Sequence, residues 1–367
     1  MLLVVGVLTA GLLSGTIPIV AHRSGGANIG PDTTPTPSNL VIVPVDPRSR
    51  VQGSIVYVKD GNLWVQTGAI ATQVTSTGRD SMPSYSPDGQ SIYYVETRQG
   101  HGFYPCGGGP AEYTEQVPSL LRLRTNGGAT EQLATGGFTS GSYSWFSWLR
   151  QPVASPDGRR LALVSDAPDP CVDDVVVQFL NLSTRRLTAA RLPETPPLGQ
   201  QDPAWSPDGR SLLYVRNGRE GAIGTPVVYR FDLSTRANVA LTGPGYLQPS
   251  WSPDGRDIAV THLGSSGSDI VVLSASSGNE LLRVTTDGRS SAPIWSPNGD
   301  AIAYLSTSSA VTDLDLVSIA GTAPQWTIGT PIALTELAGL DPGSRPSWFI
   351  PADQLGPTST GSATASP

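Results

Sequence analysis

Few side chains in this sequence combine in a pattern that supports catalysis or metal binding. Of the 367 residues only three are histidines, His22, His101 and His262, too few for a histidine-rich metal site. Lys59 is the single lysine, so Schiff-base and Ser–Lys chemistry would depend on it alone. Neither a G-x-S-x-G elbow nor a D-x-D-x-D-G calcium loop occurs. We therefore expect no metal, no cofactor and no recognisable catalytic residue.

The carboxylates that recur in the sequence are better explained as turn formers. A Ser-Pro-Asp-Gly tetrapeptide, once with Asn for Asp, supplies Asp88, Asp157, Asp208, Asp254 and Asn298. Pro fixes φ at the second turn position, and Gly accepts the left-handed conformation that re-enters a strand. Since Gly follows Asp directly, the motif differs from the S-x-D-x-G box of sialidases. We predict that these five residues shape hairpins and are not acid–base groups.

Each turn lies inside a longer repeat that predicts the fold. The repeat is Pro, usually an aromatic residue, the Ser-Pro-Asp-Gly turn and an apolar run, with copies from Pro83, Pro152, Pro203, Pro249 and Pro293. The spacing falls at or above the blade length of a propeller, about 40–50 residues. The turn joins strands A and B of each blade, and the continuous apolar run indicates that both faces of strand B are covered. A recurring tryptophan in strand A is expected to pack between blades, at Trp205, Trp251, Trp295 and Trp348.

A second periodic element predicts the number of blades. An apolar residue followed by Thr is expected to end the outer strand, D, at Val74-Thr75, Leu187-Thr188, Leu241-Thr242, Val284-Thr285 and Leu334-Thr335, with Leu133-Ala134 as a degenerate copy. These D strands exceed the A–B hairpins by one. Residues 54–75 resemble strands B, C and D without an A, and residues 345–350 resemble an A alone. We predict an all-β, six-bladed propeller of four-stranded antiparallel blades, closed by N- and C-terminal strands in one blade.

These repeats resemble those of the TolB-like, WD-repeat-like β-propeller family over about residues 54–350. The resemblance implies the fold but names no function, because this repeat recurs in unrelated proteins. TolB carries an α/β domain before its propeller, and propeller-bearing serine peptidases carry a hydrolase domain after it. Residues 22–50 and the tail after Ile350 are too short for either domain. We expect a stand-alone, monomeric propeller.

The flanking segments indicate export. Residues 1–20 are almost wholly apolar and uncharged, which is typical of a signal peptide or a membrane anchor. We assign residues 1–21 to that segment, 22–50 to a Pro/Thr/Ser/Gly-rich linker, 51–350 to the propeller and 351–367 to a disordered tail. The propeller would then be periplasmic or extracellular, with the membrane contacted only through its N-terminal segment.

The two cysteines, Cys106 and Cys171, fall in the loops expected between strands B and C of the second and third blades. Both loops would lie on the same face of neighbouring blades, and export would place them in an oxidising compartment. We predict a structural disulfide between them; two free thiols are the alternative.

The unusual sequence collects on one face of the expected ring. The A–B turns and C–D hairpins share one side, whereas the B–C loops and D–A crossovers share the other, called here the insertion face. Long insertions fall there, at about residues 97–118, 135–149, 166–173, 189–201 and 217–225. They are rich in aromatic residues, and we predict that Tyr104, Trp145 and Trp148 lie on or near a binding surface. The alternative is that these rings cap the core beneath the loops.

We therefore expect a non-catalytic binding or scaffold module that takes a protein, peptide or glycan on the insertion face. A net charge of −7 argues against a nucleic-acid partner. One alternative is a hydrolase or lyase with its site at the mouth of the central channel. Another is a sensor or assembly module whose anchor matters more than any ligand. A ring of carboxylates with Arg at the channel mouth would favour the enzyme, and an aromatic rim would favour binding.

Overall fold

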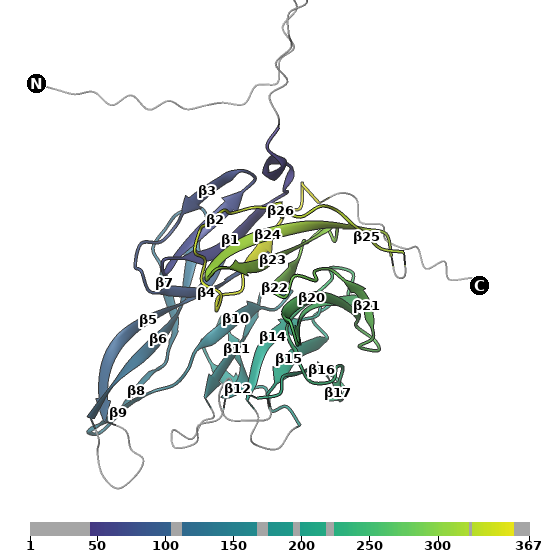
Figure 1. Cartoon of the computed structure of the whole chain (residues 1–367). Helices are drawn as coiled ribbons and strands as arrows, with labels where there is room; N and C mark the ends of the chain where they lie inside the picture. The colour runs from purple at the N-terminus through teal and green to yellow at the C-terminus, as the bar shows by residue number, and fades with distance from the viewer. Residues whose placement is uncertain are drawn as a thin grey trace, which may run out of the picture. The chain divides into compact units, whose positions relative to one another are not determined.

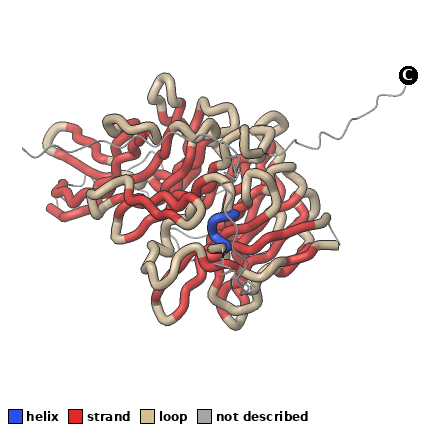
Figure 2. The backbone as a smooth tube through the Cα atoms, turned by 90° about the horizontal axis from the view of Figure 1, so that it is seen from above, coloured by secondary structure: helices blue, strands red, loops and turns tan. Residues whose placement is uncertain are grey.

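Short apolar segments separated by glycine-containing turns fold into six antiparallel sheets (Figures 1 and 2). This confirms the expected six-bladed, all-β propeller. The computed structural model describes residues 45–103, 112–166, 175–193, 199–217, 224–322 and 325–355. Within these ranges the only helix is one 3-10 turn, η1 (Pro47–Arg50). None of the helical residues in them makes a segment long and apolar enough to cross a membrane.

Blade 1 is built from both ends of the described chain. Its strand order is β27 (Ser347–Phe349), β1 (Ser54–Lys59), β2 (Asn62–Thr67) and β3 (Ile70–Gln73). Ile55 pairs with Trp348, and Val56 with Ser347, in the antiparallel contact of β1 with β27. The last described strand therefore lies beside the first, as the yellow and purple ribbons of Figure 1 show. The closure expected from the sequence is confirmed.

The other blades follow one another along the chain. Blades 2 and 3 contain β4 (Asp80–Tyr85), β5 (Ser91–Phe103), β6 (Glu112–Arg124), β7 (Glu131–Thr135), β10 (Arg150–Ala154), β11 (Arg160–Asp166), β12 (Val175–Asn181) and β13 (Leu187–Ala189). Blades 4 and 5 contain β14 (Gln200–Trp205), β15 (Ser211–Arg216), β16 (Val227–Asp232), β17 (Asn238–Ala240), β18 (Tyr246–Trp251), β19 (Asp257–Gly264), β20 (Gly267–Ser274) and β21 (Glu280–Arg283). Blade 6 contains β22 (Ser290–Trp295), β23 (Ala301–Ser308), β24 (Val311–Ala320), β25 (Thr327–Ile328) and β26 (Ile332–Ala333), the last two both paired with β24.

The hydrophobic core is a ring of clusters between neighbouring blades. Among the described residues there are six such clusters, one for each pair of adjacent blades. Successive residues of β15 alternate between two of them: Leu212 packs toward blade 3, whereas Leu213 packs toward blade 5. Because side chains of a strand alternate between its faces, a strand covered on both faces must be apolar throughout. This explains the continuous apolar runs that follow each turn.

The Ser-Pro-Asp-Gly turn is held by its own side chains. In the first copy the Ser86 hydroxyl donates to Asp88 Oδ1 at 2.6 Å, and Asp88 Oδ1 also accepts the backbone N–H of Gln90 at 3.0 Å. Gly89 takes φ +67°, the left-handed conformation that glycine adopts without steric cost. The same contacts recur at Asp157, Asp208 and Asp254. In the fifth copy Ser296 donates instead to Asp300, and Asn298 Nδ2 also donates to Asp300.

The threonine that follows strand D ties it to strand C. In four blades its hydroxyl oxygen accepts a backbone N–H from strand C, at 2.8–3.0 Å, in the pairs Leu63–Thr75, Val228–Thr242, Ile270–Thr285 and Leu314–Thr335. The assignment of Leu187-Thr188 to this position was wrong. Thr188 lies inside β13, paired with Phe179, and Gln200 Oε1 accepts the N–H of Val177 in its place.

Blade 2 carries a projecting extension where the sequence suggested loops. Strands β5 and β6 are each 13 residues long and pair from Ser91↔Arg124 to Phe103↔Glu112. A further hairpin, β8 (Gly137–Ser140) and β9 (Tyr143–Phe146), joins the end of β5 through the pair Phe103↔Ser144. The far halves of β5 and β6 together with β8 and β9 are called the arm, and Figure 1 shows them extending away from the other blades. Much of the expected loops at 97–118 and 135–149 is therefore strand.

Candidate functional site

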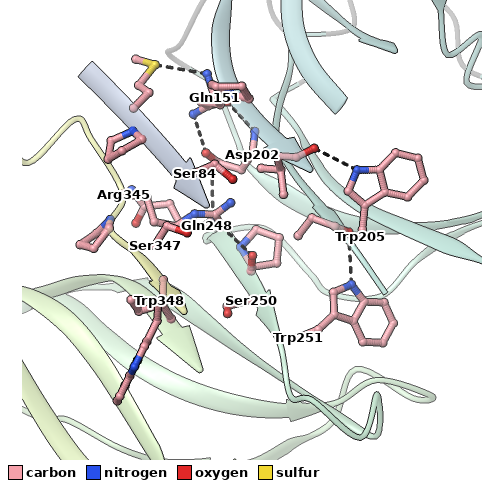
Figure 3. A pocket seen from close by; sticks show the side chains of 18 of the residues that line it. Ser84, Gln151, Asp202, Trp205, Gln248, Ser250, Trp251, Arg345, Ser347 and Trp348 are labelled. Atoms are coloured by element: carbon pink, nitrogen blue, oxygen red, sulfur yellow. Dashed lines mark hydrogen bonds between the residues drawn. The ribbon is translucent and has the colours of Figure 1, made fainter. Parts of the chain in front are cut away.

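The central channel is lined by the A strands. The residues that precede the prolines of these strands supply much of the lining. One residue precedes the proline of each A-strand repeat; together these residues, called the pre-proline ring, are Met82, Gln151, Asp202, Gln248, Ala292 and Arg345. All of them line the channel except Ala292, which is buried in the cluster between blades 6 and 1. In the first five, φ lies between 51° and 54°, and the pairing with strand B shifts register at the same point. Such a bulge re-aims a side chain, here toward the channel axis (Figure 3).

The pre-proline ring links blades 2 to 6 in succession through hydrogen bonds. The backbone N–H of Asp202 donates to Gln151 Oε1 at 2.8 Å, and that of Gln248 donates to Asp202 Oδ2 at 3.1 Å. In the same direction around the ring, Ala292 N donates to Gln248 Oε1 at 2.9 Å and Gln151 N to Met82 Sδ at 3.2 Å. The polar side chains in the channel thus satisfy backbone groups that the bulges leave unpaired.

Asp202 and Arg345 are the charged groups of the described channel lining. Asp202 is only 6% exposed, and its carboxylate also accepts from Gln151 Nε2 at 2.6 Å. Burial raises the pKa of Asp202, an effect opposed by Arg345, and burial lowers the pKa of Arg345. Arg345 donates to the carbonyl oxygen of Pro249 at 2.7 Å across the channel. The described lining contains one carboxylate, not a ring of them, and its hydrogen-bonding capacity is used to join blades.

The recurrent tryptophans pack between blades. Trp205 Nε1 donates to the carbonyl oxygen of Val153 in blade 3 at 3.1 Å, and Trp251 Nε1 donates to that of Ala204 in blade 4 at 3.2 Å (Figure 3). The Trp205 ring also lies 5.2 Å from the ring of Phe179. These contacts give the tryptophan stripe a structural role.

A second cavity, of about 370 Å³, lies between the arm and the pre-proline ring and is called the arm pocket. Its lining comes from β4, β5, β6 and the segment that leads from β9 into β10: Ser81, Met82, Val95, Thr97, Gln116, Pro118, Phe146, Ser147, Trp148, Leu149 and Arg150. Trp148 is 52% exposed, and its backbone N–H donates to Asp166 Oδ1 at 3.0 Å. The Arg150 guanidinium carbon lies 5.0 Å from the centre of the Trp148 ring.

Exposed aromatic side chains also gather on the arm itself. Phe103, Phe138 and Tyr143 are 41%, 43% and 37% exposed. Trp145 is half-buried and stacks on Phe138 with ring centroids 5.9 Å apart. Tyr104 lies outside the described residues, as do Cys106 and Cys171. Phe103 and Phe138 are not among the three residues predicted for the binding surface. Only the pairing of β8 with β9 brings Phe138 and Trp145 onto one face.

The described residues contain no group of three or more His, Cys, Asp or Glu side chains that could hold a metal ion. His101 lies on the arm, where its Nδ1 is 3.1 Å from Thr114 Oγ1. His262 packs against Tyr246 with ring centroids 4.5 Å apart.

Comparisons with known proteins agree with this architecture. The model of the TolB β-propeller domain family matches residues 131–329, and the chain belongs to that family. A curated relative, the uncharacterized protein Atu1656 of Agrobacterium fabrum, is 27% identical over 152 residues, which are 40% of this chain and 43% of that protein. The match thus spans less than half of that relative's length.

Two solved structures resemble the propeller at the level of fold. TolB from Acinetobacter baumannii has a TM-score of 0.57 and 20% identity, covering 81% of this chain and 66% of that one. A structure from Agrobacterium tumefaciens described as TolB has a TM-score of 0.57 and 18% identity, covering 83% and 95%.

Proposed function

We propose that this chain is an exported, non-catalytic scaffold that holds a protein or peptide partner on its insertion face. The observation that carries this proposal is the set of exposed aromatic side chains on and beside the arm, Phe103, Phe138, Tyr143 and Trp148. Large aromatic rings that stay partly exposed are favoured at recognition surfaces, because they bury much area at little entropic cost. The opposite face offers short, uniform turns, which leave little freedom to encode a specific partner.

The central channel gives little support to the alternative function, a hydrolase or lyase. Asp202, the one carboxylate of its described lining, accepts hydrogen bonds from Gln151 and Gln248 and lies beside Arg345. If the Asp202 carboxylate left these contacts to accept a proton from a substrate, blade 4 would lose its hydrogen bonds to Gln151 of blade 3 and Gln248 of blade 5. A general base needs a free lone pair, and a general acid needs a proton, within hydrogen-bond reach of a substrate. The recorded hydrogen bonds of this carboxylate join blades instead.

The proposed organisation places the binding face outside the cytoplasm. Residues 1–21 would serve as a signal peptide or anchor, 22–50 as a linker and 351–367 as a tail around a monomeric propeller. The apolar, uncharged character of residues 1–20 supports export. The compartment would be the periplasm or the cell exterior.

Partner capture by arm variants tests the function. The tagged propeller is cross-linked in envelope extracts, the captured protein is purified, and its affinity is measured for wild type, Phe138→Ala, Tyr143→Ala and Trp148→Ala. Each substitution should weaken binding by more than about 1 kcal/mol, roughly fivefold, as expected of hot-spot residues. Val239→Ala, at an exposed apolar residue of β17, is the matched control and should bind as wild type does.

Melting temperatures separate binding from folding. Surface substitutions usually change stability by less than about 0.5 kcal/mol, so the arm variants should melt like wild type. Unchanged affinity in all of them, or unfolding without a specific binding defect, would mean that these rings cap the core. Binding of oligosaccharides in place of any protein would move the ligand class to glycans.

A further inference from the structure

We propose that the arm pocket binds the C-terminal end of a peptide, with Arg150 pairing with its terminal carboxylate and the last side chain packing against Trp148 and Leu149. This inference rests on the proposed function and names the ligand chemistry that the site would recognise. The argument starts from the one cation in the described lining of the pocket.

Arg150 is a cation without an anion of its own. Within the described chain no hydrogen bond or ion pair holds its guanidinium, whose nearest recorded contact is the face of Trp148 at 5.0 Å. Asp202 is the one carboxylate that acts on Arg150 through space, but Asp202 lies beside Arg345 and accepts from Gln151 and Gln248. Burial lowers the pKa of Arg150, which shows that its charge has lost part of its hydration.

The rest of the pocket is shaped for an apolar group. Val95, Pro118 and Leu149 are buried, and Phe146 is partly buried beside them. Thr97 and Ser147 add hydroxyl groups to this wall. Ligand pockets commonly measure about 300–1,000 Å³ and combine apolar walls with a few placed polar groups. A cavity of about 370 Å³ is at the small end of that range, enough for one or two residues.

A peptide C-terminus matches both features on one residue. Its α-carboxylate offers two oxygens in the planar geometry that guanidinium groups bind bidentately. The side chain of the last residue is attached to the same α-carbon as this carboxylate. It can therefore contact the apolar wall while the carboxylate pairs with Arg150. An aspartate or glutamate within a chain would have to supply the apolar group from a neighbouring residue and would continue through the pocket at both ends.

Short blocked peptides test the proposal directly. N-acetyl-Leu-Phe with a free carboxyl group is titrated calorimetrically into the whole chain, in parallel with its C-terminal amide and with N-acetyl-Leu-Asp amide. The free acid should bind at least about tenfold more tightly than either amide. The wild-type comparison needs no variant, so it stands even if substitutions at Arg150 disturb folding.

Variants locate the binding. Arg150→Gln should abolish the preference for the free acid, and Arg150→Lys should retain part of it, because lysine keeps the charge but not the bidentate fork. Arg159→Gln, at an exposed arginine after a Ser-Pro-Asp-Gly turn, is the matched control and should keep the preference in full.

Three results would overturn the inference: equal affinity of acid and amide, no binding of the acid at about 1 mM, or a preference that survives in Arg150→Gln. Equal binding of the aspartyl peptide would also overturn it, in favour of an internal acidic side chain. Any of these, together with protein capture that still depends on Phe138 and Tyr143, would leave the proposed scaffold function standing. If protein capture no longer depended on the arm but the preference for the free acid persisted, the peptide inference would stand and the proposed scaffold function would fall.

Discussion

Gly89 couples the turn of the second blade to the strand that closes the ring. A Cβ atom placed on Gly89 would lie 2.1 Å from Phe349 Cε1, so a side chain there collides with the closing strand. Phe349 ends β27, and its ring lies 5.8 Å from that of Tyr85. The equivalent Gly158 has nearly the same φ, +66° against +67°, but nothing within 4 Å of the Cβ position.

The pair Gly89→Ala and Gly158→Ala therefore separates backbone strain from steric pressure on the closure. A left-handed φ costs an L-residue about 1–2 kcal/mol, and both variants incur it. Overpacking a filled site adds about 1–3 kcal/mol, and only Gly89→Ala incurs that. We expect Gly158→Ala to lower the free energy of unfolding by about 1–2 kcal/mol and Gly89→Ala by about 2–5 kcal/mol.

Urea unfolding of the two variants, alone and combined with Phe349→Leu, measures the difference. A smaller side chain at 349 makes room for the new methyl group, so Gly89→Ala should cost less in the Phe349→Leu background, while Gly158→Ala should cost the same in both. Equal destabilisation by the two glycine variants would refute the reasoning. So would the absence of coupling between positions 89 and 349.

Three further predictions can be tested. Ending the chain before Arg345 removes β27 and exposes the inner edge of β1, so the melting temperature should fall sharply and aggregation rise; ending it after Pro351 should be nearly silent, and equal melting temperatures would contradict the closure. We predict that Cys106 and Cys171 form a disulfide that stabilises the fold by about 3–4 kcal/mol; non-reducing peptide mapping should find the bridged peptide, and two alkylatable thiols would exclude it. The Ser155 hydroxyl and the Arg159 N–H hold the pKa of Asp157 below its usual value. The ionised Asp157 side chain therefore contributes fully to the free energy of unfolding above the unfolded-state pKa of about 4, and this contribution is lost as pH falls through the lower folded-state pKa. Asp157→Asn should flatten the acid limb of a stability–pH curve, and an unchanged limb would show that the turn contributes nothing.

The blades were predictable because their sequence signals are local. A Ser-Pro-Asp-Gly turn needs only its own side chains, and the apolar run after it follows from burial on both faces, as Leu212 and Leu213 illustrate. The missing A strand of blade 1 could be found because Trp348 repeats the motif of the other A strands. The error at Thr188 arose because a Leu-Thr pair inside a short strand looks the same as one at its end.

The site was less predictable because it depends on contacts between blades. The pre-proline position holds Met, Gln, Asp, Gln, Ala and Arg in turn, so no single residue type marks it in the sequence. Their left-handed backbone is also unexpected before proline, which disfavours helical conformations. The sequence of the arm predicts loops because residues 104–111 are rich in glycine, although β5 and β6 pair over their full length. Arg150 carries no sequence signal at all; its significance comes from lining the arm pocket against the Trp148 ring without a carboxylate of its own.

The sharing of blade 1 between the two ends of the described chain also sets an order of events in time. Strands β1, β2 and β3 are made first, yet their innermost partner, β27, is made last. Until it arrives, β1 has an unpaired inner edge and a growing chain cannot complete its ring. Chains fold while they are synthesised or exported, and exposed edges on incomplete folds invite association with other chains. A chain that ends at any point before β27 therefore cannot close the ring. Closure takes place only after the whole propeller sequence has been synthesised.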